Sequence, residues 1–409
     1  MFKRVARLKY FCGLDLGSSE FKVALVKAQD AQNLELLGVF QTRAMGLKDG
    51  SVSDLEDLSQ CIKSAVKSVA RKFSVEVRSL RVGIGADALS VHRSAAVIPL
   101  IDSGTKVISP SDIRKVNHQA RLLGVDIDEE TIHDFPQMYR VDDVNAALNP
   151  AGLFGRKLES NILILAAKAN RLRNVVQAVH QAGFEVDRLS CSSYAAAEVV
   201  LDKNLKDRGC VLVDIGAKLT NVLLFKDGVL RDIQLIPWGG QYVTQTLADR
   251  LSLTIEKAEE IKRLHAVAAP GPSAETGDIL VLRATEYVPV SRQSVCDAVG
   301  WEIENFLTHL ETVIEGSVLV HDLNGGIVMV GGGALLPGLM ERVEQRVHLP
   351  VGMGVGAKGL NNVPVFAGAI GLAKMNYLQN TEESIHWGRA GQIKNKVLTQ
   401  LKDMCQEYF

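Results

Sequence analysis

The apolar positions of the chain follow two different spacings. Residues 11–28 and 210–228 share one order of features: an apolar run, an aspartate, a turn that contains glycine, and a second apolar run. Short apolar runs joined by such a turn predict β-hairpins. In residues 54–73 the apolar positions recur every three or four residues instead, which predicts an amphipathic helix. The pattern therefore predicts a mixed α/β chain in which one kind of hairpin occurs twice.

The order of the predicted elements divides the chain into segments. Three strands followed by a helix occur in residues 1–82 and again within residues 167–380, and residues 83–166 hold a smaller α/β segment. We therefore expect two related α/β lobes that face each other. Lobe I would comprise residues 1–82 and the start of 167–380, and lobe II the remainder of 167–380. Residues 83–166 would form an inserted subdomain, and residues 381–409 a linker and terminal helix.

Composition narrows the classes of protein to consider. The 409 residues are too many for one typical core, so we expect at least two domains. The net charge of −1 provides no basic field and argues against a nucleic-acid partner. The six cysteines include no C-x-x-C pair, which argues against a zinc site or disulfide framework and fits a reducing cytoplasm. No run approaches the roughly 18 apolar residues of a membrane span, and the apolar stretch after the basic start is too short for a signal peptide.

The two aspartates of the hairpins, Asp15 and Asp214, each precede a glycine turn. Backbone N–H groups and hydroxyls in such a turn can bind an anion, and glycine lets phosphate approach closely. A carboxylate beside phosphate requires a divalent cation between them, for which Mg²⁺ is the natural choice. Lys22 could add a positive charge. Two such turns could hold a polyphosphate; the alternative is two surface hairpins whose Asp and Gly only form turns.

Two further elements could complete a nucleotide site. Residues 329–339 read as an apolar strand, three glycines and a helix start, which suits a nucleoside or phosphate but is also typical of a tight turn. Glu259 and Lys262 lie three positions apart on a predicted helix and so face the same way. They could flank an adenine and ribose; the alternative is a solvated helix face.

The C-terminal residues predict an amphipathic helix. Three lysines, at positions 394, 396 and 402, lie off its apolar face. A helix this short is marginal alone in water, and a membrane surface would stabilise it by accepting the apolar stripe. The alternative is a terminal helix that docks on the protein itself or on a partner. The apolar residues proposed to contact membrane are Ile393, Val397, Leu398, Leu401, Met404, Cys405, Tyr408 and Phe409.

The motifs DLGSS, DIG..LT, GGGALLPG and AEEIK together resemble the actin/Hsp70/sugar-kinase ATPase superfamily and, within it, the FtsA family of bacterial cell division. The narrower resemblance rests on HDFPQMYRVDD with NPAGLFGRKLESNILIL, on residues 233–266, and on the amphipathic C-terminus. It spans residues 11–375 and the tail. It implies a two-lobed actin-like fold with duplicated mixed-sheet (RNase H-like) domains, an FtsA-type inserted α/β subdomain and a C-terminal amphipathic helix.

The resemblance also implies an ATP site with Mg²⁺ held mostly through water by Asp15 and Asp214. The residues implied are Asp15, Gly17, Ser18, Ser19 and Lys22 at the first phosphate loop, Asp214, Gly216, Lys218 and Thr220 at the second, Glu259 and Lys262 beside the adenine, and Gly331, Gly332 and Gly333 in the adenosine loop. The second loop departs from the family's D-I-G-G-G-T-T-D at Ala217, Lys218, Leu219 and Asn221. Ser192 and Ser193 replace an acidic Glu-Pro. We therefore expect weakened ATP binding, partly compensated by the charge of Lys218, and slow or absent hydrolysis with no catalytic residue assigned.

The function implied by the resemblance is that of a membrane adaptor. The chain would bind ATP, polymerise with itself, and tether FtsZ filaments to the inner face of the cytoplasmic membrane at the division site, as a peripheral protein. The FtsZ C-terminal peptide would bind around residues 240–320, and other division proteins would be partners. One alternative is the PilM family of type IV pilus platforms, which has the fold without the long tail or the NPAGLFGRKLE pattern. Another is a small-molecule kinase, which requires a catalytic base and a substrate pocket.

Overall fold

The computed structural model describes residues 9–28, 34–101, 104–142, 145–268, 277–283, 286–356 and 364–379. Two five-stranded sheets form its body, with the orders β13-β6-β1-β2-β3 and β16-β15-β14-β19-β20. The strands of the first are β1 (Lys9–Leu16), β2 (Glu20–Ala28), β3 (Leu34–Arg43), β6 (Ser79–Ile84) and β13 (Glu185–Cys191). Those of the second are β14 (Cys210–Ile215), β15 (Thr220–Lys226), β16 (Val229–Ile236), β19 (Ile327–Val330) and β20 (Val351–Met353).

The two sheets have the same topology. In each, three consecutive strands run antiparallel, and the first of them pairs in parallel with a later strand. We call the part built on the first sheet lobe I and the part built on the second lobe II. The prediction of a repeated strand–strand–strand–helix unit is thereby confirmed.

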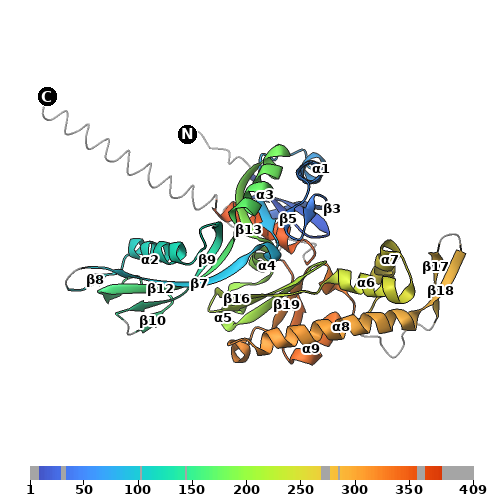
Figure 1. Cartoon of the computed structure of the whole chain (residues 1–409). Helices are drawn as coiled ribbons and strands as arrows, with labels where there is room; N and C mark the ends of the chain where they lie inside the picture. Colours follow the sequence, from blue (N-terminus) through green and yellow to red (C-terminus); the bar gives the residue numbers. More distant parts are fainter. Residues whose placement is uncertain are drawn as a thin grey trace, which may run out of the picture.

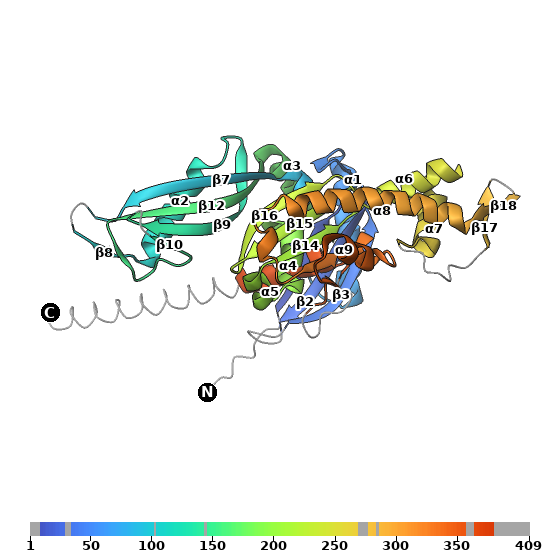
Figure 2. The ribbon, with the colours of Figure 1, turned by 90° about the horizontal axis from the view of Figure 1, so that it is seen from below.

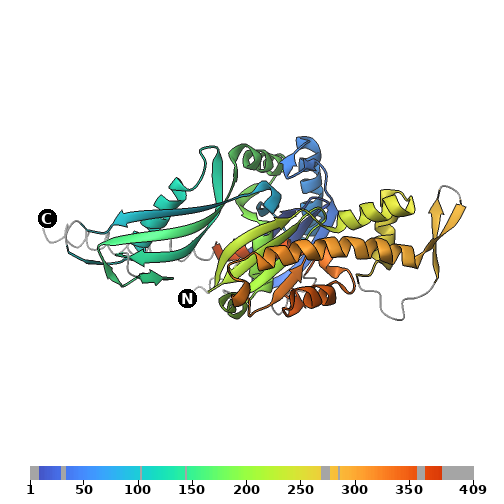
Figure 3. The same ribbon diagram turned by 60° about the horizontal axis from the view of Figure 1, so that its bottom comes forward.

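Helices cover the outer faces of both sheets (Figures 1 and 3). In lobe I, α1 (Leu55–Lys72) and α3 (Ala169–Gln181) pack on one face of the first sheet in a common apolar core. Asp54 caps α1 through the backbone N–H of Asp57. In lobe II, four helices pack with the second sheet in a second core. They are α6 (Gly240–Leu251), α7 (Ile255–His265), α8 (Arg292–Glu315) and α9 (Leu339–Val347).

A third core joins the lobes. It contains residues of both sheets, of α4 (Ser192–Val200) and of the helical residues 367–379, so these two helices lie between the sheets. The two helices cross closely, because a Cβ added to Gly371 would collide with the carbonyl oxygen of Ala195. A helix at residues 192–200 was not predicted from the sequence.

The inserted subdomain is a four-stranded sheet with the order β10-β9-β12-β7, covered by α2 (Pro110–Leu123). Figures 1 and 2 show it projecting to one side of the lobes. Ser109 and Asp112 form a capping box at the start of α2. The strands of the subdomain are β7 (Ser90–Pro99), β8 (Lys106–Val107), β9 (Glu129–Val141), β10 (Asn145–Ala147), β11 (Phe154–Gly155) and β12 (Lys157–Lys168).

The long strand β9 contacts both lobes. On the lobe I side, the ring nitrogen Nε2 of His133 accepts a hydrogen bond from the backbone N–H of Cys191 at 3.1 Å. On the lobe II side, the side-chain amide of Gln137 donates to the carbonyl oxygen of Leu230 at 2.9 Å. Arg231 donates to the carbonyl oxygen of Gln137 at 2.7 Å. Strand β9 therefore links the inserted subdomain to both lobes.

The remaining elements are short. A hairpin of β17 (Asp278–Arg283) and β18 (Glu286–Ser291), which was not predicted, lies at the start of α8 (Figure 3). The others are β4 (Leu47–Lys48), β5 (Ser51–Val52), α5 (Lys203–Arg208), and the 3₁₀ turns η1 (Ala86–Ala88), η2 (Val320–Asp322) and η3 (Gly333–Leu335). Within the described residues, no helix is long and apolar enough to cross a membrane. The predicted C-terminal amphipathic helix lies outside the described residues.

Candidate functional site

The two hairpins hold their aspartates at equivalent positions. Each aspartate is the second-last residue of its strand, β1 or β14. Across the turn, Asp15 pairs with Lys22 and Asp214 pairs with Asn221. Four residues, 17–20 or 216–219, lie between the last paired positions of the two strands and are called the turn here. The repeat seen in the sequence is thus a repeat of local geometry, as predicted.

The glycine of each turn is required by a close approach of the backbone. A Cβ at Gly17 would lie 2.6 Å from the carbonyl oxygen of Glu20, and one at Gly216 would lie 2.9 Å from that of Leu219. In the second turn, the N–H of Gly216 also donates to the carbonyl oxygen of Leu219 at 2.9 Å. Both turns are therefore tight. Ser18 in the first turn is exposed.

The start of α4 brings the two aspartates together. The hydroxyl of Ser192 donates to Oδ1 of Asp15 at 2.6 Å, and the hydroxyl of Ser193 donates to Oδ2 of Asp214 at 2.7 Å. Both serines are buried. Because consecutive residues contact the two aspartates, the hairpins of both lobes converge on one helix start. The sequence showed these serines only as departures from the FtsA pattern.

The carboxyl group of Asp15 lies in a poorly hydrated position. Loss of hydration raises the pKa of Asp15, the charge of Lys22 and the hydroxyl of Ser192 lower it, and the nearby carboxylate of Asp214 raises it further. A Cβ at Gly368 would lie 2.9 Å from Oδ2 of Asp15. The second carboxyl oxygen therefore faces a backbone position that has no side chain, at the start of the helical residues 367–379.

Asn221 contributes a buried acceptor that has no partner. Its side-chain amide donates to the hydroxyl of Ser193 at 2.7 Å. Its Oδ1 is buried and, in the part of the chain that the structure describes, has no hydrogen-bond partner. Such an atom requires an explanation, because buried polar atoms are nearly always paired. Together with the carboxylates of Asp15 and Asp214 it forms a set of oxygen acceptors.

This acceptor set fits a hydrated Mg²⁺ ion. Mg²⁺ keeps several of its waters and needs only one or two carboxylates, and its waters would donate to the oxygens of Asp15, Asp214 and Asn221. Among the described residues, no three acidic, His or Cys side chains lie close enough together to bind a metal directly. The residues present therefore suit an ion held through water rather than one enclosed by protein ligands.

The third glycine loop lies against the second turn. Strand β19 pairs in parallel with β14, with Val330 opposite Asp214. Gly331 has a φ of +88°, and a Cβ there would collide with the carbonyl oxygen of Ile215 and lie 2.9 Å from Oδ1 of Asp214. A Cβ at Gly333 would collide with the side chain of Ile215. A Cβ at Gly332, by contrast, would have no atom of the described residues within 4 Å. Gly332 is thus the open position of the loop.

Glu259 and Lys262 form a network between α6 and α7. The Nζ of Lys262 donates to Oε2 of Glu259 at 2.6 Å, to the hydroxyl of Thr244 at 2.8 Å and to the carbonyl oxygen of Gly240 at 3.0 Å. Arg263 donates to the other carboxyl oxygen of Glu259 at 2.7 Å. Both residues are half-buried, and the network holds their side chains in place. Their contact with a nucleoside stays a prediction.

The start of α6 holds the second turn in place. The N–H groups of Gly240 and Gln241 donate to the carbonyl oxygens of Gly216 and Ala217, at 3.0 and 2.7 Å. The hydroxyl of Thr220, predicted to face nucleotide, is fully buried and donates to the carbonyl oxygen of Trp238 at 2.9 Å. The geometry therefore gives Thr220 a role in fixing the turn.

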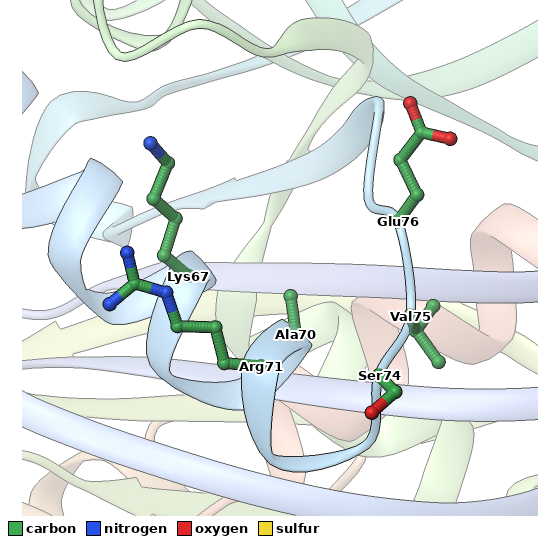
Figure 4. A pocket seen from close by; sticks show the side chains of 6 residues that line it. All are labelled: Lys67, Ala70, Arg71, Ser74, Val75 and Glu76. Atoms are coloured by element: carbon green, nitrogen blue, oxygen red, sulfur yellow. The ribbon is translucent and has the colours of Figure 1, made fainter.

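A surface hollow at the end of α1 is separate from this site (Figure 4). Its lining residues are Lys67, Ala70, Arg71, Ser74, Val75 and Glu76. Cys12, Leu14 and Leu16 of β1 pack toward α1. Successive side chains of a strand point to opposite faces, so Asp15 points away from α1. The hollow and Asp15 are therefore on opposite faces of the first sheet.

His133 gives the stability of this region a pH dependence. Burial lowers the pKa of His133 to about 3, with Arg81 and Arg188 adding to the effect. The folded protein therefore keeps this ring neutral, whereas the unfolded chain takes up a proton below a pH of about 6.5. Acidification then favours unfolding. We expect His133→Phe to remove about 2 kcal/mol of the stability lost between about pH 7 and pH 5, which is about 1.36 kcal/mol for each pH unit below the unfolded pKa.

Denaturant titrations at several pH values measure this effect. The phenyl ring preserves packing on Tyr194, whose ring centroid is 5.0 Å from that of His133. His180→Phe is the control, because the side chain of His180 is half exposed beside Glu185. Equal pH slopes for wild type and His133→Phe would show that this histidine is not the group responsible.

The two equivalent lobes, with an aspartate turn in each and one helix start between them, define an actin-like fold. Solved structures with this fold include the PilM–PilN type IV pilus biogenesis complex, with a TM-score of 0.64 and 18% identity over 90% of this chain and 98% of that chain. MreB5 of Spiroplasma citri bound to ADP has a TM-score of 0.54 and 14% identity, over 91% of this chain and 98% of that chain. At these identities the likeness concerns the fold alone.

Sequence comparison assigns the family. The family model for cell division protein FtsA matches residues 211–371, and that for the SHS2 domain inserted in FtsA matches residues 87–166. Cell division protein FtsA of Streptococcus pneumoniae is 30% identical over 90% of this chain and 80% of its own length. That of Pseudomonas aeruginosa is 29% identical over 98% of each chain. The chain belongs to the FtsA family.

Proposed function

We propose that the protein binds ATP with Mg²⁺ between its two lobes. The observation that carries this proposal is the convergence of two equivalent aspartate turns on the start of α4, Asp15 through Ser192 and Asp214 through Ser193. The unpaired oxygen of Asn221 beside them supports a hydrated cation at the same place. Nucleotide-bound MreB5 has the same fold, which agrees with this assignment.

Each part of the site has a separate role in this proposal. Backbone N–H groups of turns 17–20 and 216–219 would bind the phosphates, with Lys22 and Lys218 adding positive charge. Asp15 and Asp214 would hold the waters of Mg²⁺, which neutralises phosphate charge when bound. The glycine loop at 331–333 would accept the nucleoside at its open position. Glu259 and Lys262 would lie beside the adenine.

We further propose that ATP is held with slow or absent hydrolysis. Attack by water requires a general base within hydrogen-bond reach. At the start of α4, the side chains that contact the two aspartates are those of Ser192 and Ser193. Their hydroxyls donate hydrogen bonds to the carboxylates. A neutral hydroxyl in this arrangement cannot accept a proton from water. Calorimetry with Mg-ATP and an assay of phosphate release test both parts: binding heat without steady release is expected, and no heat at millimolar ATP contradicts the proposal.

The cellular role that we propose is that of an FtsA-type actin-like adaptor in cell division. ATP would favour filaments of this protein, and lobe II around residues 240–320 would bind the C-terminal peptide of FtsZ, with other division proteins as additional partners. Exposed apolar side chains at this end of lobe II support a protein-binding surface. The exposed side chains of Leu280 and Tyr287 lie on one face of the β17–β18 hairpin. The exposed ring of Trp301 on α8 is covered by Arg250 of α6, whose Cζ lies 5.3 Å from the ring centroid.

The proposed location is the inner face of the cytoplasmic membrane at the division site. The sequence of residues 391–409 supports peripheral attachment, because its apolar positions share one helix face. Three lysines against two acids give modest electrostatic help, so attachment should be reversible and depend on filament formation.

Co-flotation with anionic vesicles and FtsZ tests the adaptor role. We expect full-length protein with Mg-ATP to carry FtsZ to the top of the gradient, because the tail supplies the membrane contact. A version ending at Ala390 should leave both proteins at the bottom. If the full-length protein floats while FtsZ stays at the bottom, the FtsZ contact is rejected. Absence of flotation of the full-length protein would reject the membrane role of the tail.

A further inference from the structure

Two ion pairs join the lobes beside the phosphate turns. Nζ of Lys218 in the second turn lies 3.0 Å from Oδ1 of Asp49, and Arg263 of α7 lies 3.7 Å from the carboxylate of Glu20 in the first turn. In each pair lobe II supplies the cation and lobe I supplies the acid. The phosphate turns themselves therefore take part in the contact between the lobes.

Asp49 is held where it meets Lys218 by a tight turn. Strands β4 and β5 pair through Leu47 with Val52, which leaves Asp49 and Gly50 at the tip. Both have positive φ, of 48° and 68°. Two central residues with positive φ are typical of a type I′ hairpin turn, whose twist matches that of the flanking strands. Asp-Gly is a favoured sequence for this turn. The position of the carboxylate is thus set by the backbone.

The ion pair itself is weak enough to exchange. The side chain of Asp49 is 72% exposed and that of Lys218 is 40% exposed. Exposed pairs contribute little, because water and salt screen them. A polyphosphate offers more charge and more acceptor oxygens than one carboxylate, so it is the better partner for an ammonium group. Ala217 precedes Lys218 in the same turn. The side chain of Ala217 hinders the approach of phosphate to the backbone, and the charge of Lys218 would compensate for this.

We propose that Lys218 is a movable phosphate-binding cation, which Asp49 holds in the ligand-free protein and which the polyphosphate of a nucleotide takes from it. This inference rests on the proposed binding of nucleotide between the lobes. It makes Asp49 an inhibitory residue: each binding event must break a contact between the lobes. Binding of nucleotide thereby replaces a direct contact between the lobes with one through the phosphates.

Calorimetry of the full-length protein with Mg-ATP tests the exchange with two variants and their combination. Asp49→Asn should tighten binding by about threefold, because Lys218 no longer has to break a weak ion pair with Asp49 before it can bind phosphate. Lys218→Ala should weaken binding by about tenfold, as expected for loss of one charge-assisted contact. The double variant should bind as weakly as Lys218→Ala, because Asp49 acts only through Lys218.

Asp232→Asn is the matched control. Asp232 forms an exposed ion pair of 2.8 Å with Arg93, between lobe II and the inserted subdomain and away from the phosphate turns. Its loss should leave ATP affinity unchanged. Unchanged or weaker binding by Asp49→Asn overturns the inference. So does equal tightening by Asp49→Asn in the presence and absence of Lys218, because Asp49 would then repel nucleotide directly.

Thermal unfolding of the same four proteins without nucleotide separates this inference from the proposed function. A double-mutant cycle should show coupling between Asp49 and Lys218 in the ligand-free protein and loss of that coupling at saturating Mg-ATP. Coupling that persists at saturation overturns the exchange while leaving nucleotide binding intact. If wild type binds no Mg-ATP, the proposed function fails and the inference fails with it.

Discussion

Asp214→Ala is expected to abolish Mg²⁺-dependent binding of ATP, with a loss of affinity of at least about a hundredfold, or about 2.7 kcal/mol. The carboxylate of Asp214 accepts a hydrogen bond from the hydroxyl of Ser193 and pairs across the hairpin with Asn221, whose oxygen has no partner among the described residues. Its removal takes away one of the two carboxylates proposed to hold the waters of the ion. Calorimetry with Mg-ATP measures the loss.

Two further variants make this result specific. Asp214→Asn keeps an oxygen that can accept from Ser193, so the fold should be preserved while the charge needed beside Mg²⁺ is lost. Asp249→Asn on α6 is the control, because Asp249 accepts a surface hydrogen bond from Gln245 at 2.9 Å, away from the aspartate turns. It should bind like wild type. Wild-type affinity of Asp214→Asn would remove Asp214 from the proposed ion site.

Gly371→Ala is expected to lower the free energy of unfolding by about 3 kcal/mol, at the upper end of overpacking costs. A Cβ at this position would collide with the carbonyl oxygen and carbonyl carbon of Ala195 on α4. Neither helix can move freely, since α4 holds both aspartates and residues 367–379 pack between the sheets. Denaturant titration monitored by circular dichroism measures the change.

Gly300→Ala provides a control within another helix. In the part of the chain that the structure describes, a Cβ at Gly300 of α8 would have no atom within 4 Å, so alanine should be neutral or stabilise the helix by up to about 1 kcal/mol. If both substitutions have the same small effect, the crossing of the two helices is looser than the structure indicates. If Gly371→Ala is fully folded under the assay conditions but binds ATP more weakly than wild type, the added methyl group has shifted α4 at the site.

The parts predicted correctly from sequence were those with local signals. The hairpins around Asp15 and Asp214 follow from apolar runs and glycine turns, and the repeat of the sheets follows from their order. The convergence of both aspartates on Ser192 and Ser193 had no such signal, because 177 positions separate Ser192 from Asp15 and only tertiary packing brings them together.

Other features were missed for physical reasons that can be stated. The β17–β18 hairpin contains Pro289, and proline lowers the expectation of a strand because it lacks an N–H. Residues 192–200 are rich in alanine and serine and are buried nearly all round, so they show no amphipathic spacing. Glu259 and Lys262 were placed correctly on one helix face, but their partners Thr244 and Gly240 come from a different helix.

The attachment of β9 to both lobes has a mechanical consequence. His133 contacts lobe I and Gln137 contacts lobe II, only four positions apart on one strand. The far end of the inserted subdomain, at β8 and β11, lies well away from these two anchor points (Figure 1). A small rotation of one lobe against the other would therefore produce a larger displacement at that end than at the two contacts. The proposed binding of nucleotide between the lobes would, if it rotates them, displace that end many residues away from the phosphate turns.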